Sequence, residues 1–118
     1  MTNSLIRNLF QLIPSSLPHE VFETLAETST IKIERIISKG HHSPENFWYD
    51  QEQTEWVLLL KGQAHLEFEQ GIIELNPGDY LTIAAHQKHR VAWTTPEQET
   101  LWLVVFYDEG YQLKAGQI

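Results

Sequence analysis

The sequence predicts an all-β domain that follows a short helical extension. From residue 31 onward, apolar residues either alternate with a period of two or form short runs, as strands do. Turn-forming residues interrupt these runs at regular spacing. The turn signals are Lys61-Gly62, Gln70-Gly71, Asn76-Pro77-Gly78-Asp79 and Thr95-Pro96. Many short strands at such spacing are typical of a β-sandwich or a β-barrel.

The N-terminal region has a different pattern, which favours helix. In residues 4–13 the apolar positions recur at helical spacing, and Pro14 ends the pattern. A second short helix is predicted in residues 17–27, where Pro18 suits a first helical turn and Glu20 suits the positive end of the helix dipole. The chain is therefore expected to have three parts: an N-terminal helical extension over 1–30, a barrel over 31–110 and a C-terminal tail over 111–118.

Two of the predicted strands are apolar on both faces. The strands are expected at 31–38, 46–50, 54–60, 63–69, 71–75, 80–84, 88–94 and 100–107. Both faces are apolar in 54–60 and in 100–107. A strand with one face in water does not need a second apolar face, so the N-terminal helices or a second subunit should cover it. We favour a homodimer; a two-layer sandwich within one chain is the alternative.

Composition narrows the class of protein. The 118 residues suffice for one domain with one core, and the formal net charge of −8 argues against binding to nucleic acid or to an anionic membrane. The absence of cysteine excludes thiol nucleophiles, cysteine-based zinc sites and disulfides. The first residues lack the long apolar core of a signal peptide, and no apolar run is long enough to span a bilayer. We expect a cytoplasmic protein.

One glutamate and one histidine are predicted to point into the barrel. Alternation places Glu55 on the face of Val57, and it places His89 on the face of Val91 and Trp93. A buried carboxylate is costly unless it is paired, hydrogen-bonded, protonated or metal-bound. The two side chains therefore form either part of a nitrogen and oxygen ligand set for a metal, or a hydrogen-bonded pair that closes the mouth of the barrel.

Residues 38 to 107 resemble the cupin superfamily. Its first motif has His-x-His, three or four residues, Glu, six residues and Gly, and Glu55 and Gly62 fit the last two positions. Its second motif has Gly, five residues, Pro-x-Gly, two residues, His, three residues and Asn, and Gly78 and His89 fit. The resemblance implies a double-stranded β-helix, a jelly-roll-like barrel with a pocket inside.

The chain also departs from these motifs. With four residues before Glu55, the first motif's histidine positions hold Trp48 and Asp50. The second motif's Pro, Gly and Asn positions hold Ala84, His86 and Trp93. The resemblance then implies a metal set of Asp50, Glu55 and His89 with His86 as an additional candidate, in a pocket lined by Trp48 and Trp93. A realignment that uses His41 or His42 as a ligand stays open.

These residues support three functions. The first is a pocket that holds a divalent ion (Fe, Mn, Ni or Zn) and a small molecule, as in a dioxygenase-like or isomerase-like cupin whose catalytic residues are Glu55 and His89. The second is a non-catalytic cupin that binds or senses a small ligand. The third is metal-free acid–base catalysis by the same two residues, as in cupin-type sugar epimerases. The fold alone does not choose among them.

Overall fold

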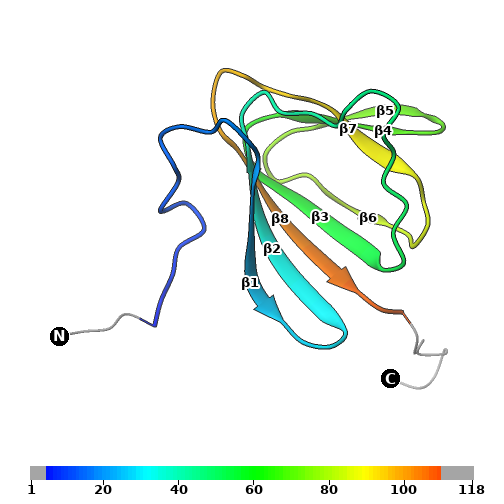
Figure 1. The fold of residues 1–118 in the computed structure, drawn as a ribbon, viewed down its shortest axis with the longest axis horizontal. Coiled ribbons are helices and arrows are strands. Elements are labelled where there is room, and N and C mark those ends of the chain that lie inside the picture. Colours follow the sequence, from blue (N-terminus) through cyan, green and yellow to red (C-terminus); the bar gives the residue numbers. More distant parts are fainter. Residues whose placement is uncertain (1–4, 110–118) are drawn as a thin grey trace.

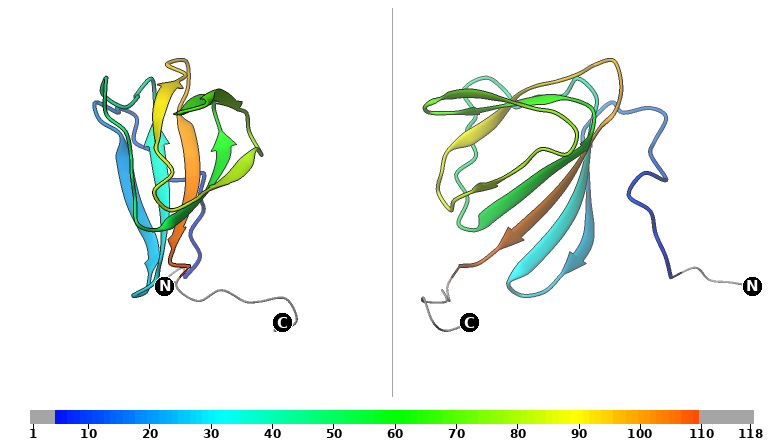
Figure 2. Two further views of the ribbon diagram at one scale, coloured as in Figure 1. Left: turned by 90° about the vertical axis from the view of Figure 1, so that its right-hand side faces the viewer. Right: turned by 180° about the vertical axis from the view of Figure 1, so that it is seen from behind.

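The computed structural model describes residues 5–109, in which eight strands form two antiparallel sheets. The larger sheet has the order β1-β2-β8-β3-β6, and the smaller sheet has the order β5-β4-β7. The two sheets face each other as layers, with β1 at one edge of the larger sheet (Figures 1 and 2). The strands are β1 (Val21–Glu27), β2 (Ile31–Ser38), β3 (Thr54–Lys61), β4 (Ala64–Phe68), β5 (Gly71–Leu75), β6 (Tyr80–Ile83), β7 (His89–Thr94) and β8 (Thr100–Tyr107).

The hydrophobic core lies between the two sheets. Alternation along each strand supplies it, since residues two apart point to the same face. From the larger sheet come Val57, Leu59 and Val104, and Leu66 opposes them from the smaller sheet. All four side chains are at most 2% exposed. The all-β prediction is therefore confirmed, and so is the prediction of strands near seven of the eight expected places.

The expected strand at 46–50 is replaced by a turn. Phe47 N donates to Pro44 O at 3.1 Å, and Asn46 adopts a left-handed φ of 65°. Only Tyr49 in this segment pairs like a strand residue, through an isolated bridge to His89. Pro44 lacks a backbone N–H and favours a turn, so it outweighs the strand propensity of the aromatic residues that follow.

The N-terminal helical extension was predicted wrongly, because residues 5–109 contain no helix. Residues Val21–Glu27 instead form β1, which pairs antiparallel with β2 along the edge of the larger sheet. Backbone pairing with an open sheet edge outweighed the helical spacing of the apolar residues. The pairing has a register shift between Thr24 and Ala26, so that Leu25 has no partner on β2. Residues 1–4 and the predicted tail at 111–118 lie outside the described residues.

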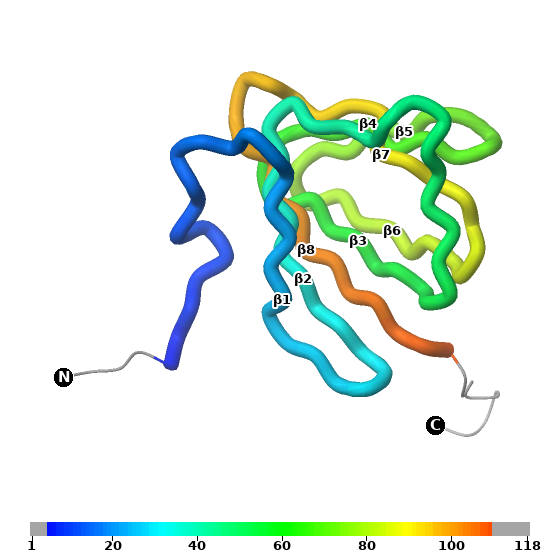
Figure 3. The backbone as a smooth tube through the Cα atoms, in the orientation of Figure 1, coloured from blue at the N-terminus to red at the C-terminus, as the bar shows by residue number. Residues whose placement is uncertain are grey.

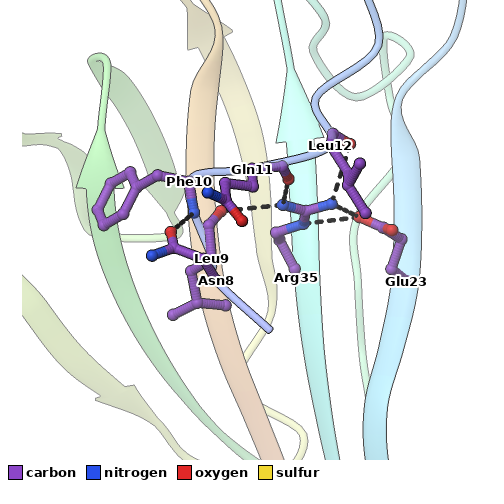
Figure 4. Close-up of polar contacts among 7 residues, drawn as sticks. All are labelled: Asn8, Leu9, Phe10, Gln11, Leu12, Glu23 and Arg35. Carbon is purple, nitrogen blue, oxygen red and sulfur yellow. Dashed lines mark hydrogen bonds and ion pairs between the residues drawn. The ribbon is translucent and has the colours of Figure 1, made fainter. Parts of the chain in front are cut away.

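The segment before β1 is held by Arg35 on β2. Figure 3 shows how this segment turns into β1. The Arg35 side chain, which is almost fully buried, donates to the backbone carbonyls of Leu9 (2.9 Å), Gln11 (2.6 Å) and Leu12 (3.3 Å), and it pairs with Glu23 of β1 (Figure 4). An irregular segment thus gains the partners for its carbonyls that a helix would have supplied internally.

Candidate functional site: an acidic pocket with a buried Glu–His pair

A pocket of about 270 Å³ opens between the two sheets. Its walls come mainly from β2, β3, β7 and β8, and most of the lining is aliphatic or aromatic, including Phe22, Trp102 and Phe106. A pocket with an apolar lining and a few polar groups is the usual form of a small-molecule site. The polar and charged side chains that line it are Glu20, Lys32, Glu34, Tyr49, Gln51, Glu55 and His89.

Glu55 and His89 form the buried centre of this pocket. Nε2 of His89 lies 3.2 Å from Oε1 of Glu55, and the two side chains are 6% and 12% exposed. Nδ1 of His89 lies 2.9 Å from the backbone carbonyl of Gln87. A carbonyl only accepts, so Nδ1 must carry a proton, and Nε2 is the atom that gains or loses one. The geometry therefore places a single titrating nitrogen against a carboxylate.

The surroundings of His89 favour its protonated form. Burial lowers the pKa of the imidazole, but the bond to Glu55, the bond to Gln87 O and the charge of Glu55 together raise the pKa above its ordinary value. A neutral ring would turn the lone pair of Nε2 toward the carboxylate, which is repulsive. Tyr49 stacks on the ring at 5.4 Å between centroids, and Phe68 flanks it at 6.1 Å. The pair is thus held rigidly in a proton-sharing arrangement.

The other two predicted ligands lie elsewhere. Asp50 Oδ1 and His86 Nδ1 are 2.7 Å apart, but their side chains are 45% and 65% exposed, and neither lines the pocket. They pair with each other outside the cavity. The structure thus separates the expected four-residue set into two carboxylate–imidazole pairs, one buried and one exposed.

The predicted pocket tryptophans also lie outside the cavity lining. Trp93 is opposite His65 on β4, with ring centroids 4.7 Å apart, and it is 36% exposed. The β4–β7 register shifts between His65 and Leu66, so Leu66 pairs with Val91 and the residue between Val91 and Trp93 has no partner. Such a bulge turns Trp93 to the outer face, where simple alternation would have placed it inside. Trp48 is half-buried and does not line the pocket.

His41 and His42, which lie in the loop before the first motif, do not reach the pocket. His41 Nδ1 accepts from Lys39 N at 2.8 Å, and His42 Nδ1 lies 2.9 Å from Ser43 O. Both rings are therefore engaged in local contacts with the loop backbone, and neither lines the cavity.

Comparison with known proteins identifies the fold family. The cupin domain model matches residues 34–106, more than half of the chain. The chain belongs to the cupin family. No curated protein sequence matches it.

Solved structures agree with this assignment. A protein from Ralstonia eutropha JMP134, provisionally named a mannose-6-phosphate isomerase, is 46% identical, with 87% of this chain and 97% of that chain covered and a TM-score of 0.85. A cupin superfamily protein from Desulfitobacterium hafniense DCB-2 is 19% identical, with 82% and 84% covered and a TM-score of 0.69. A protein of unknown function from Streptococcus pyogenes is 15% identical, with 94% and 93% covered and a TM-score of 0.72. The last two show similarity of fold alone.

The cupin motif fits the structure in a register one residue away from the predicted one. The motif permits three or four residues before its glutamate. With three, the two histidine positions hold Tyr49 and Gln51, and both of these residues line the pocket with Glu55 and His89. The sequence analysis missed them because it used the longer spacing, and a shift of one residue moves every side chain to the opposite face.

Two further carboxylates line the pocket and were not predicted. Glu34 on β2 is 7% exposed and pairs with Lys32 at 3.0 Å. Glu20, just before β1, accepts a hydrogen bond from Ser38 Oγ at 2.6 Å, and Ser38 in turn accepts from Trp102 Nε1 at 3.2 Å. Alternation in β2 alone could have placed Glu34 inside. Glu20 could not be found, because it was assigned to a helix.

Cupin domains commonly bind divalent metals, but the residues of this pocket do not fit the family's set of three histidines and one glutamate. Two of the four positions hold a phenol and a carboxamide, Tyr49 and Gln51. Within residues 5–109, no three His, Cys, Asp or Glu side chains come together in a group that could hold a metal ion. Among the same residues, no helix is long and apolar enough to cross a membrane.

Proposed function

We propose that this cupin performs metal-free acid–base chemistry on a small molecule, with Glu55 and His89 as the catalytic pair. The observation that supports it is the contact of His89 Nδ1 with Gln87 O, which leaves Nε2 facing Glu55 at the wall of the pocket. In the imidazolium form Nε2 donates a proton, and after donation it accepts one. Glu55 orients the ring and, as the carboxylate, removes the carbon-bound proton while Nε2 of His89 protonates the carbonyl oxygen. In the second half of the reaction Glu55 returns its proton to the neighbouring carbon, and Nε2 takes the proton of the neighbouring hydroxyl.

Isomerase-like chemistry is the reaction class that this pair serves best. Moving a hydrogen between neighbouring carbons of a hydroxycarbonyl compound requires a group that removes one proton and returns another at neutral pH. The provisional name of the Ralstonia eutropha protein agrees with this class.

Deuterium exchange tests this proposal. A panel of aldoses and ketoses, free and 6-phosphorylated, is incubated with the protein in D2O after treatment with a chelator, and exchange at carbon is followed by NMR. We expect exchange that survives chelation and falls at least a hundredfold in His89→Gln. The absence of exchange on the whole panel would contradict catalysis and favour a binding protein. Exchange that disappears with the metal would instead support the metal-dependent alternative.

Metal content is measured on the same preparation. Elemental analysis of protein purified without a metal-affinity tag should give far less than one Fe, Mn, Ni or Zn per chain. Near-stoichiometric metal that is lost in His89→Ala would favour the predicted metal site over metal-free chemistry.

We also propose that the protein is a homodimer that packs through the outer face of the larger sheet. On that face Ile33, Val105 and Trp56 lie in one row across β2, β8 and β3. In the next row Leu103 lies between Leu58 and Arg35, and Arg35 binds the backbone of residues 9–12. All five apolar side chains are half-buried. A row of apolar side chains on a sheet face, with further leucines beside it, is typical of a protein interface. Light scattering after size exclusion should give twice the chain mass, and a monomer at micromolar concentration would contradict the proposal.

A further inference from the structure

The charges that face the pocket leave it negative. Three carboxylates line the cavity, against one ammonium and one imidazole. Lys32 is paired with Glu34 at 3.0 Å, and His89 is paired with Glu55 at 3.2 Å. The Glu20 carboxylate has a neutral donor, the hydroxyl of Ser38. Whether His89 is protonated or not, negative charge therefore exceeds positive charge in this space.

Neither nearby arginine offsets this excess. Arg35 points to the opposite face of β2, where it holds Glu23 and three backbone carbonyls. Arg90 pairs with Glu67 at 2.9 Å and donates to Ser43 O at 3.0 Å. Neither arginine lines the cavity. A phosphate group in the pocket would therefore lack the guanidinium fork that usually binds it.

The pocket also contains a buried acceptor that lacks a donor. Oε1 of Gln51 is buried and has no hydrogen-bond partner within residues 5–109. Buried acceptors without donors are costly unless a bound molecule supplies the hydrogens. The phenol of Tyr49 lies close enough to all three carboxylates to respond to their charges. Burial raises its pKa, and Glu20, Glu55 and Glu34 each raise that pKa further. The three carboxylates thus act on one region of the cavity.

We propose that this pocket binds an unphosphorylated small molecule rich in hydrogen-bond donors, and that an amino group on the molecule strengthens binding. A protonated amine gains from Glu20 and donates to the unpaired Gln51 oxygen, and the aromatic lining accommodates the apolar side of the molecule. A phosphate dianion meets the same carboxylates and is repelled. This inference rests on the pocket of the proposed function and specifies its ligand class. It separates this chain from what the provisional name of the Ralstonia eutropha protein would suggest.

Three sugars with one skeleton test the charge preference. D-mannosamine, D-mannose and D-mannose 6-phosphate present a cation, a neutral molecule and a dianion, and their dissociation constants are measured by calorimetry at low salt. We expect mannosamine to bind about tenfold more tightly than mannose, and mannose 6-phosphate to bind at least tenfold more weakly than mannose. Tightest binding of the phosphate, equal binding of all three, or no binding of any of them would overturn the proposal.

Glu20→Gln locates the source of the preference. The amide keeps an oxygen that accepts from Ser38 and removes the unpaired charge. The preference for mannosamine over mannose should fall to threefold or less. Glu97→Gln makes the same charge change at an exposed site outside the cavity lining and serves as the matched control. An unchanged preference in Glu20→Gln would contradict the assignment.

His89→Gln distinguishes this inference from the proposed function. If the ligand class is right and the catalytic proposal is wrong, the charge order of binding appears in wild type while no deuterium exchange occurs. If catalysis is right and the ligand class is wrong, exchange depends on His89 while the phosphorylated sugar binds best. Binding and exchange are therefore measured separately on the same set of variants.

Discussion

The molecule contains two carboxylate–imidazole pairs that are chemically alike and physically different. Glu55 and His89 lie 3.2 Å apart with side chains 12% and 6% exposed, whereas Asp50 and His86 lie 2.7 Å apart with side chains 45% and 65% exposed. The exposed pair, whose charges are screened by water, has the shorter distance. Because an exposed ion pair gains little and a buried one cannot lose a partner without a desolvation cost, distance alone does not rank the two.

The difference in burial also separates their chemical use. At His89 the Gln87 carbonyl fixes the tautomer, and Tyr49 and Phe68 fix the plane of the ring. His86 is bound through its backbone N–H to Gln51 O at 2.7 Å, which anchors a turn rather than an imidazole plane. The buried pair therefore has the oriented imidazole that the proposed acid–base role needs, while the exposed pair belongs to a turn outside the pocket lining.

Replacing Glu55 by Gln should have the largest effect on stability. The amide preserves the shape of the side chain and removes the charge that compensates protonated His89. We expect a loss of about 2 kcal/mol in the free energy of unfolding at pH 6, measured by urea denaturation. Asp50→Asn makes the same chemical change in the exposed pair. If Glu55→Gln lost no more unfolding free energy than Asp50→Asn, the expected difference between the two pairs would be contradicted.

The stability of the wild-type protein should depend on pH through His89. Its folded pKa is raised above the unfolded value of 6.5, so the pair contributes fully below pH 6.5 and the contribution is lost as pH rises through the folded pKa. One proton limits the slope to about 1.4 kcal/mol per pH unit. Denaturation midpoints between pH 6 and pH 9 should decline in wild type and flatten in His89→Gln. Identical slopes in the two proteins would refute the assignment.

Replacing Asp50 by Asn should change stability much less. An exposed pair is screened by salt and contributes at most about 0.5 kcal/mol. The expected loss should shrink further when the salt concentration is raised to about 1 M, whereas the loss in Glu55→Gln should persist. A salt-independent loss above about 1 kcal/mol would show that the exposed pair is not merely a surface contact.

How far the sequence predicted the site depended on the regularity of the strands. Alternation in β3 placed Glu55 and Val57 correctly, and the motif spacing from Gly78 placed His89 correctly. Trp93 was misplaced because a bulge in β7 interrupts alternation just before it. Bulges are set by pairing with a neighbouring strand, so the pattern of one strand does not reveal them.

The register predicted for the first motif was wrong for a related reason. Residues 46–50 form a turn with one bridge rather than a strand, so the face that each side chain takes depends on local dihedral angles such as the left-handed φ of Asn46. The sequence analysis therefore placed Trp48 and Asp50 at the motif's two histidine positions, whereas Tyr49 and Gln51 line the pocket. The same limitation applies to β1, whose apolar residues satisfy both helical and strand spacing and are assigned only by the open edge of β2.

The smallest predicted effect concerns the backbone of the exposed pair. His86 has a left-handed φ of 63° and occupies the cupin glycine position, so its side chain is held in a conformation that glycine adopts without strain. In His86→Gly the relief of this strain opposes the loss of the contact with Asp50 and the greater flexibility of the unfolded chain. We expect a net gain of about 0.3 kcal/mol in the free energy of unfolding.

The double variant Asp50→Asn/His86→Gly separates the two contributions. If strain dominates, His86→Gly should be stabilising by a larger amount in the Asp50→Asn background, where no ion pair is left to lose. If the ion pair dominates, His86→Gly should destabilise the wild-type background and be neutral in the other. Either result gives the strength of the exposed contact directly. That value can then be set beside the loss in Glu55→Gln, measured under the same conditions, to give the contribution of burial to a carboxylate–imidazole pair in one protein.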